Sequence, residues 1–205
     1  WQVAESAFQN LIALKPTTAR GYRDLAVVYA QQGQIQMALK TLDGGISKSQ
    51  QPEVLLSERA SLHADLGNGK QAVADLERGI ELAPQYIDSY QQLALLYIAL
   101  KDTTNAVGTM TKALKANPKS VMLMVNQGGI FHALGMTQKA LGAYVRAIDI
   151  APDDPAAYRA LGFMAAEVES LTVARGAWEK ARTLAPKDLE VRDALSQLYL
   201  ALRDP

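Results

Sequence analysis

The sequence contains no cysteine, and its 205 residues carry 21 Lys and Arg against 21 Asp and Glu. The lack of cysteine excludes a disulfide framework, a zinc ribbon and thiol chemistry, although it does not fix the compartment. The lack of a basic excess argues against a nucleic-acid partner. The longest apolar run, Leu93–Leu100, is far shorter than the ~20 residues that span a bilayer. We therefore expect no membrane insertion of this segment.

Prolines recur every 34 residues, at Pro84, Pro118, Pro152 and Pro186, and Pro16 lies two periods before the first of these. When the chain is set out in units of this length, three positions hold only alanine or glycine. They are position 8 (Ala26, Ala60, Ala94, Gly128, Gly162), position 20 (Ala38, Ala72, Ala106, Ala140, Ala174) and position 27 (Gly45, Gly79, Ala113, Ala147, Ala181). Large apolar residues recur at position 24 (Leu42, Leu76, Met110, Tyr144, Trp178). Small residues predict close approach of two helices, and the large ones fill the space between them.

Each unit is therefore predicted to be a pair of antiparallel helices. Positions 4, 7, 8 and 11 share one helix face, and positions 20, 24 and 27 share another. Glycine stands at the predicted turn in Gly33, Gly67 and Gly135, whereas Lys101 and Glu169 depart from it. The proline ends the second helix because it cannot continue the hydrogen-bond ladder.

The start of the next helix is marked by capping residues in several units. Ser120, Asp188 and Asp154 are the predicted caps, and Pro155 follows Asp154 at the first helical position. Five complete units are predicted, at residues 19–52, 53–86, 87–120, 121–154 and 155–188.

The two ends of the chain match only half a unit each. Residues 1–18 match a second helix, and residues 189–205 match a first helix, with Asp204 and Pro205 as the start of another. The chain also begins at Trp1 rather than methionine and shows no signal peptide. We therefore expect a fragment of a longer repeat array, and exposed repeat ends leave self-association open.

These columns resemble the tetratricopeptide repeat (TPR), through its W-x2-L-G-x2-Y, A-x3-F-x2-A and P positions. In the unit that begins at Pro155, the matching residues are Tyr158, Leu161, Gly162, Ala174, Trp178, Ala181 and Pro186. The resemblance covers essentially the whole chain and implies an all-α superhelix, a single solenoid over residues 1–205. Arg59 and Gln127 replace an apolar residue at position 7, and Ala165 replaces an aromatic at position 11, so we expect looser packing there.

Catalytic chemistry requires several groups that converge within hydrogen-bond reach. His63 and His132 lie two units apart, which predicts a separation of roughly 20 Å, so they cannot share a metal. The segment Leu66–Lys70 lacks the first glycine and the Ser or Thr of a phosphate-binding loop and is interpreted as a turn. We predict no enzyme, no metal site and no cofactor.

TPR arrays bind peptides or protein segments along a concave groove lined by first helices, and the resemblance implies the same here. The predicted partner groove comprises Arg20, Arg23, Asp24, Glu58, Gln92, Leu95, Ile98, Met122, Val125, Asn126, His132 and Phe163. Apolar anchors are expected near Leu95, Ile98, Val125 and Phe163, with charged contacts near Arg20 and Arg23. The amides of Gln92 and Asn126 suit an extended peptide backbone. Alternatively, the apolar groups pack between helices or are covered by further repeats.

A second candidate surface is a convex strip of glycines at position 22, namely Gly108, Gly142 and Gly176. Glycine in an exposed helix interior costs ~1 kcal/mol relative to alanine. The strip is interpreted as a site where another backbone approaches closely, or as the product of repeat duplication without a role.

The leading hypothesis is a non-catalytic scaffold that binds a protein or peptide segment and forms part of a larger protein. One alternative is a periplasmic scaffold region of a bacterial envelope or exopolysaccharide export system, because this chain resembles the periplasmic repeat regions of such systems. Another is a regulatory array attached to an enzyme outside this segment. The location stays open between periplasm and cytoplasm, with the periplasm favoured.

Overall fold

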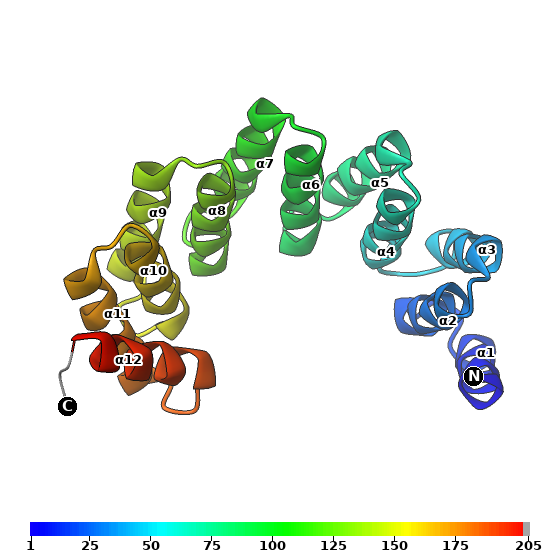
Figure 1. Ribbon diagram of the computed structural model, residues 1–205. Helices are drawn as coiled ribbons and strands as arrows, with labels where there is room; N and C mark the ends of the chain where they lie inside the picture. The colour runs from blue at the N-terminus through cyan, green and yellow to red at the C-terminus, as the bar shows by residue number, and fades with distance from the viewer. Residues whose placement is uncertain (203–205) are drawn as a thin grey trace. The chain divides into compact units, whose positions relative to one another are not determined.

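The computed structural model describes residues 1–202, which form twelve α-helices and no strand (Figure 1). The helices are α1 (Gln2–Leu14), α2 (Ala19–Gln31), α3 (Ile35–Ile46), α4 (Pro52–Asp65), α5 (Gly69–Leu82), α6 (Ile87–Ala99), α7 (Thr103–Ala116), α8 (Val121–Ala133), α9 (Thr137–Ile150), α10 (Pro155–Glu167), α11 (Leu171–Leu184) and α12 (Leu189–Leu202). The predicted all-α fold of antiparallel helix pairs is confirmed. The predicted cap at Asp204 and Pro205 lies outside the described residues.

The chain divides into two compact units, residues 1–109 (unit 1) and 110–205 (unit 2), and each is described by itself. From α1 to α6 and from α8 to α12, each helix packs against the next one along the chain. First helices of successive repeats also touch, α2 with α4, α4 with α6 and α8 with α10. Packing of each pair on its neighbours is the arrangement expected of a stacked repeat. The single solenoid over residues 1–205 stays a prediction.

The turn inside each helix pair requires a left-handed backbone at one residue. Gly33, Gly67 and Gly135 have φ angles of 74°, 75° and 68° there, and Lys101 and Glu169 adopt the same conformation with φ of 60° and 56°. In all five turns the amide that follows this residue donates to a carbonyl five residues earlier, as from Gln34 to Tyr29. The turn is thus a Schellman-type helix end, and its geometry is imposed on Lys101 and Glu169 despite their side chains.

Helix ends follow the proline and capping pattern. Five helices (α1, α5, α7, α9 and α11) each end two residues before the proline that follows them. The Ser120 hydroxyl accepts a hydrogen bond from the Leu123 amide, and the Asp154 and Asp188 carboxylates accept from the amides of Ala156 and Val191. The three predicted caps are confirmed.

The small-residue columns lie in the core, where Ala38, Ala72, Ala106, Ala140 and Ala174 are fully buried. The size of the residue at position 8 is matched to the size of the side chain at position 24. A Cβ atom at Gly128 would collide with the ring of Tyr144, and one at Gly162 would collide with the indole of Trp178. Where position 24 is Leu42, position 8 is Ala26, and both belong to one buried cluster. Glycine at position 8 therefore makes room for an aromatic ring.

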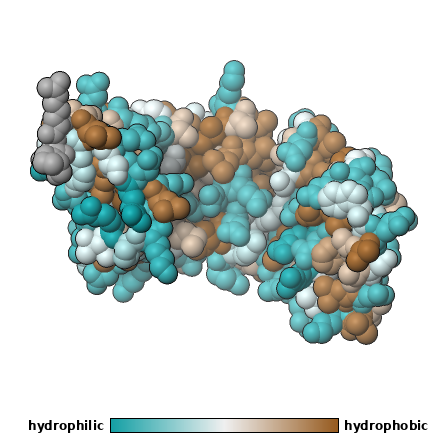
Figure 2. Space-filling view, turned by 60° about the horizontal axis from the view of Figure 1, so that its bottom comes forward, coloured by the Kyte–Doolittle hydropathy of each residue, from teal (hydrophilic) through white to brown (hydrophobic). Residues whose placement is uncertain are grey.

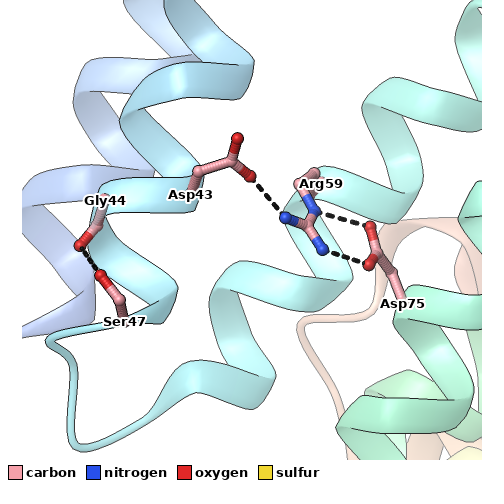
Figure 3. Close-up of polar contacts among 5 residues, drawn as sticks. All are labelled: Asp43, Gly44, Ser47, Arg59 and Asp75. Carbon is pink, nitrogen blue, oxygen red and sulfur yellow. Dashed lines mark hydrogen bonds and ion pairs between the residues drawn. The ribbon is translucent and has the colours of Figure 1, made fainter.

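The two polar residues at position 7 find polar partners on second helices. Arg59 of α4 points between Asp43 of α3 and Asp75 of α5 (Figure 3) and pairs with both carboxylates. Its Nε donates to Asp75 Oδ2 over 2.8 Å. Gln127 accepts from Arg146 over 2.9 Å. Ion pairs and hydrogen bonds thus take the place of the apolar contacts that other repeats make at position 7. At position 11, Ala165 is buried in the core although it replaces an aromatic residue.

Hydrogen bonding to Asp75 is the main cause that raises the pKa of the Arg59 guanidinium above its ordinary value. The Arg59 guanidinium is therefore permanently charged. Because the Asp75 side chain is only 9 % exposed, its negative charge must be compensated by Arg59 rather than by water.

Candidate functional site

The predicted groove residues lie on α2, α4 and α6 in unit 1 and on α8 and α10 in unit 2. We call the side of these first helices, and of α12, that carries positions 2, 5, 6, 9, 12 and 13 the first-helix face of each unit. In Figure 2 hydrophobic residues gather in separate patches among hydrophilic ones on the visible face of each unit.

Arg20 and Arg23 both pair with Asp24 on the first-helix face of unit 1. The Arg20 Nε lies 3.3 Å from Asp24 Oδ2, and the Arg23 Nη2 lies 3.0 Å from Asp24 Oδ1. Two cations thus share one carboxylate whose side chain is 19 % exposed. Their charge is partly compensated within the chain.

The predicted apolar anchors differ in how accessible they are. Leu95, Met122 and Phe163 are 49 %, 59 % and 37 % exposed. Ile98 is half-buried, and Val125 packs against the cluster of Met124, Ala147 and Ala157. The structure therefore leaves three large apolar side chains open to a partner and assigns Val125 in part to the core of unit 2.

The first-helix face of unit 1 contains a cavity of about 290 Å³ between α2 and α4. Its lining comprises Ala26, Val27, Ala30, Gln31, Leu42, Glu58, Ser61, Leu62 and Asp65. The floor is apolar, and the two charged lining residues are the carboxylates Glu58 and Asp65. Burial raises the pKa of Glu58, an effect that nearby Arg23 opposes and Asp24 reinforces.

The first-helix face of unit 2 contains a cavity of about 410 Å³ between α10 and α12. It is lined by Phe163, Glu190, Asp193, Ala194 and Gln197. The Phe163 ring packs edge to face against the Trp178 ring, with ring centroids 5.1 Å apart, and this contact restrains the orientation of Phe163. Our sequence reasoning missed the residues of α12, although they occupy the same repeat positions as the groove residues of complete units.

The polar groove residues of the later repeats are partly engaged. The His132 Nε2 lies 3.2 Å from Glu167 Oε2, which ties α8 to α10 on the first-helix face of unit 2. Gln92 and Asn126 are half-buried. Over residues 1–202 no group of three or more His, Asp or Glu residues is placed to hold a metal ion. None of the helices in that range is long and apolar enough to cross a membrane.

The three glycines of the predicted convex strip are exposed residues on second helices. A Cβ atom added to Gly108, Gly142 or Gly176 would meet no heavy atom within 4 Å. Packing within the chain therefore does not require glycine at these positions. Gly142 and Gly176 lie in unit 2 and Gly108 lies in unit 1. The strip as an interaction surface stays a prediction.

The Gly142→Ala and Gly176→Ala substitutions are each expected to raise the free energy of unfolding by about 0.4–1 kcal/mol. Alanine restricts the unfolded chain and meets open space in the helix. Urea denaturation followed by circular dichroism measures the change. Gly135→Ala is the matched control, because its φ of 68° makes alanine strained there despite equally open space. Destabilisation by the first two substitutions would show that these helices are not built as described.

Comparison with known proteins agrees with the repeat geometry. Family models described as tetratricopeptide repeat match residues 55–86 and 92–155. No curated protein matches the sequence.

Solved structures match most of the chain. Yeast Tom70 has 21 % sequence identity and a TM-score of 0.80, over 98 % of this chain and 43 % of its own. TTC0263, a thermophilic TPR protein in Thermus thermophilus, has 23 % identity and a TM-score of 0.65, over 89 % of this chain and 100 % of its own. YrrB, a TPR protein with an unusual peptide-binding site, has 18 % identity and a TM-score of 0.54, over 93 % of this chain and 98 % of its own. At these identities the likeness shows the fold alone.

Proposed function

Because this chain is a tetratricopeptide repeat protein, we propose that it is a non-catalytic scaffold whose first-helix faces bind a protein or peptide segment. The observation that carries the proposal is the pair of cavities on these faces, one in each unit. The exposed side chains of Leu95, Met122 and Phe163 add apolar contact area on the same faces, and Phe163 also lines the cavity of unit 2. Exposed apolar side chains around a hollow are typical of an interaction site.

The similarity to solved TPR proteins supports a role in protein interaction. Scaffolds of the TPR family are generally non-enzymatic. We propose that no cofactor, metal or nucleic acid takes part. The finer hypotheses are a periplasmic region of a bacterial envelope or exopolysaccharide export system, and a regulatory array beside an enzyme. Self-association through repeat ends also stays a proposal.

Selection from a displayed library of random dodecapeptides tests the proposed scaffold function. The 205-residue chain is immobilised, and enriched peptides are synthesised with a fluorescent label for anisotropy titration. Leu95→Asn in unit 1 or Met122→Asn in unit 2 is expected to weaken their binding at least about tenfold, because a polar amide would have to be desolvated at the contact.

Matched controls place the same amide on exposed apolar residues of second helices. Leu82 and Val145 are 51 % and 46 % exposed, and Leu82→Asn and Val145→Asn are expected to leave binding unchanged. Circular dichroism of all four variants checks that the helical content is retained. Failure to enrich any peptide, or equal loss of binding in the controls, would refute binding by the first-helix faces.

A further inference from the structure

The two cavities on the first-helix faces share one chemical character. Each has an apolar floor, and every charged residue in its lining is a carboxylate, Glu58 and Asp65 in unit 1 and Glu190 and Asp193 in unit 2. The chain as a whole has no net charge. The negative lining is therefore a local property of the two cavities, and it recurs in repeats that differ in sequence.

The carboxylate of Glu58 is only weakly compensated within unit 1. Its interactions with Arg23 and Asp24 are coulombic. The nearby Arg23 is already paired with Asp24. Burial raises the pKa of Glu58, so the surroundings within the chain disfavour its negative charge. A cation seated beside Glu58 would reverse this effect.

The carboxylates of Glu190 and Asp193 line the cavity of unit 2 together with an aromatic ring. Asp193 accepts a hydrogen bond over 2.7 Å from the amide of Gln197, a neutral partner that does not offset a negative charge. Glu190 forms an ion pair with Arg159 over 3.2 Å, and because the two side chains are 72 % and 46 % exposed, solvent screens this pair and weakens it. Phe163 lies in the same lining. A ring face beside a carboxylate is a favourable site for an ammonium or guanidinium group.

We propose that the partner of these cavities is a basic protein segment in which lysine or arginine alternates with apolar side chains, an inference that rests on the proposed function. In unit 2 the cation lies against Phe163 and pairs with Asp193, while its aliphatic stem covers the ring. In unit 1 the cation pairs with Glu58 above the apolar floor of Val27 and Leu62. An acidic segment is repelled at both cavities.

The experiment uses the peptides that the library selection recovers. Lysine and arginine are expected to be enriched in them, next to apolar residues. For each peptide, an analogue is made with citrulline for arginine and acetyl-lysine for lysine, which removes charge and retains length. The analogues are expected to bind at least about tenfold more weakly at low salt, and higher salt is expected to reduce the difference.

Nearly isosteric substitutions locate the charge contact in the protein. Glu58→Gln or Asp193→Asn is expected to weaken each charged peptide about three- to tenfold and to leave its neutral analogue unchanged. Phe163→Leu, which retains an apolar floor, is expected to weaken peptides that respond to Asp193→Asn. Glu81→Gln and Asp149→Asn remove the same charge from exposed sites on second helices and serve as controls.

Two results would overturn the basic segment and leave the scaffold function intact. One is recovery of neutral or acidic peptides whose binding still depends on Leu95 or Met122. The other is binding of charged peptides that is unaffected by Glu58→Gln and by Asp193→Asn. An empty selection would overturn the proposed function together with this inference.

Discussion

The Gly162→Ala substitution is expected to lower the free energy of unfolding by about 1–3 kcal/mol, although glycine to alanine normally stabilises a helix. The reason is the indole of Trp178, which occupies the space where the new methyl group would lie. Trp178 is itself buried and packs in one cluster with Ala165 and Ala174. The ring cannot turn away, so the helices α10 and α11 must move apart.

The loss is expected to be largely recovered in the double variant Gly162→Ala, Trp178→Leu. This pair reproduces Ala26 and Leu42, which occupy the same two positions in unit 1 and are both buried. Trp178→Leu alone is expected to destabilise by a few kcal/mol, about the cost of a large-to-small core change, because space remains beside Gly162. The double variant should therefore be more stable, by about 0.5–3 kcal/mol, than the sum of the two single effects on the free energy of unfolding predicts.

Urea denaturation followed by circular dichroism measures the four states of this cycle, and hydrogen exchange of the α10 and α11 amides locates the loss. Gly129→Ala is the control, since a Cβ atom there meets nothing within 4 Å. Additive effects in the cycle would contradict the match between positions 8 and 24.

Replacement of Arg59 by leucine is expected to destabilise unit 1 by about 3–5 kcal/mol, the second large effect. The substitution leaves the carboxylate of Asp75, which is nearly buried, without its bidentate partner. The neighbouring Asp43 is 57 % exposed and remains hydrated. The cost therefore arises at Asp75 rather than from the lost surface contact.

The double variant Arg59→Leu, Asp75→Ala is expected to be about as stable as the original chain or more stable. It reproduces Leu161 and Ala177, the residues at the same positions in the last complete repeat. Replacing a buried ion pair by packed apolar residues is often neutral or stabilising. Thermal and urea denaturation of the two single variants and the double variant measure the coupling. A double variant as unstable as Arg59→Leu alone would show that the ion pair has a structural role beyond mutual compensation.

The fold was predictable from sequence because its features recur in every repeat. The spacing of the prolines placed the helix ends, and the alanine and glycine columns placed the contacts between helices. Ser120, Asp154 and Asp188 were identifiable as caps because capping depends on the local backbone alone. The left-handed turn was evident from three glycines, whereas Lys101 and Glu169 adopt it only because the packed helices on either side fix the turn.

The candidate site was less predictable, since it is made of what differs between repeats. The sequence predicted a line of groove residues in which Leu95 and Val125 were both apolar anchors. In the structure Leu95 is exposed, whereas Val125 packs largely against the core of unit 2. It also predicted charged contacts at Arg20 and Arg23, which share Asp24. These outcomes depend on rotamers and neighbours that a repeat position does not specify.

The sequence by itself determined that the chain forms pairs of antiparallel helices of the TPR type, because periodic burial of small and large residues leaves few other ways to pack. The tertiary structure alone decided which carboxylates line a cavity and which are compensated. Glu190 and Asp193 come from α12, Phe163 comes from α10, and the cavity exists only where these helices stand side by side. Charge and apolar surface become a binding site through that juxtaposition, which no single segment encodes.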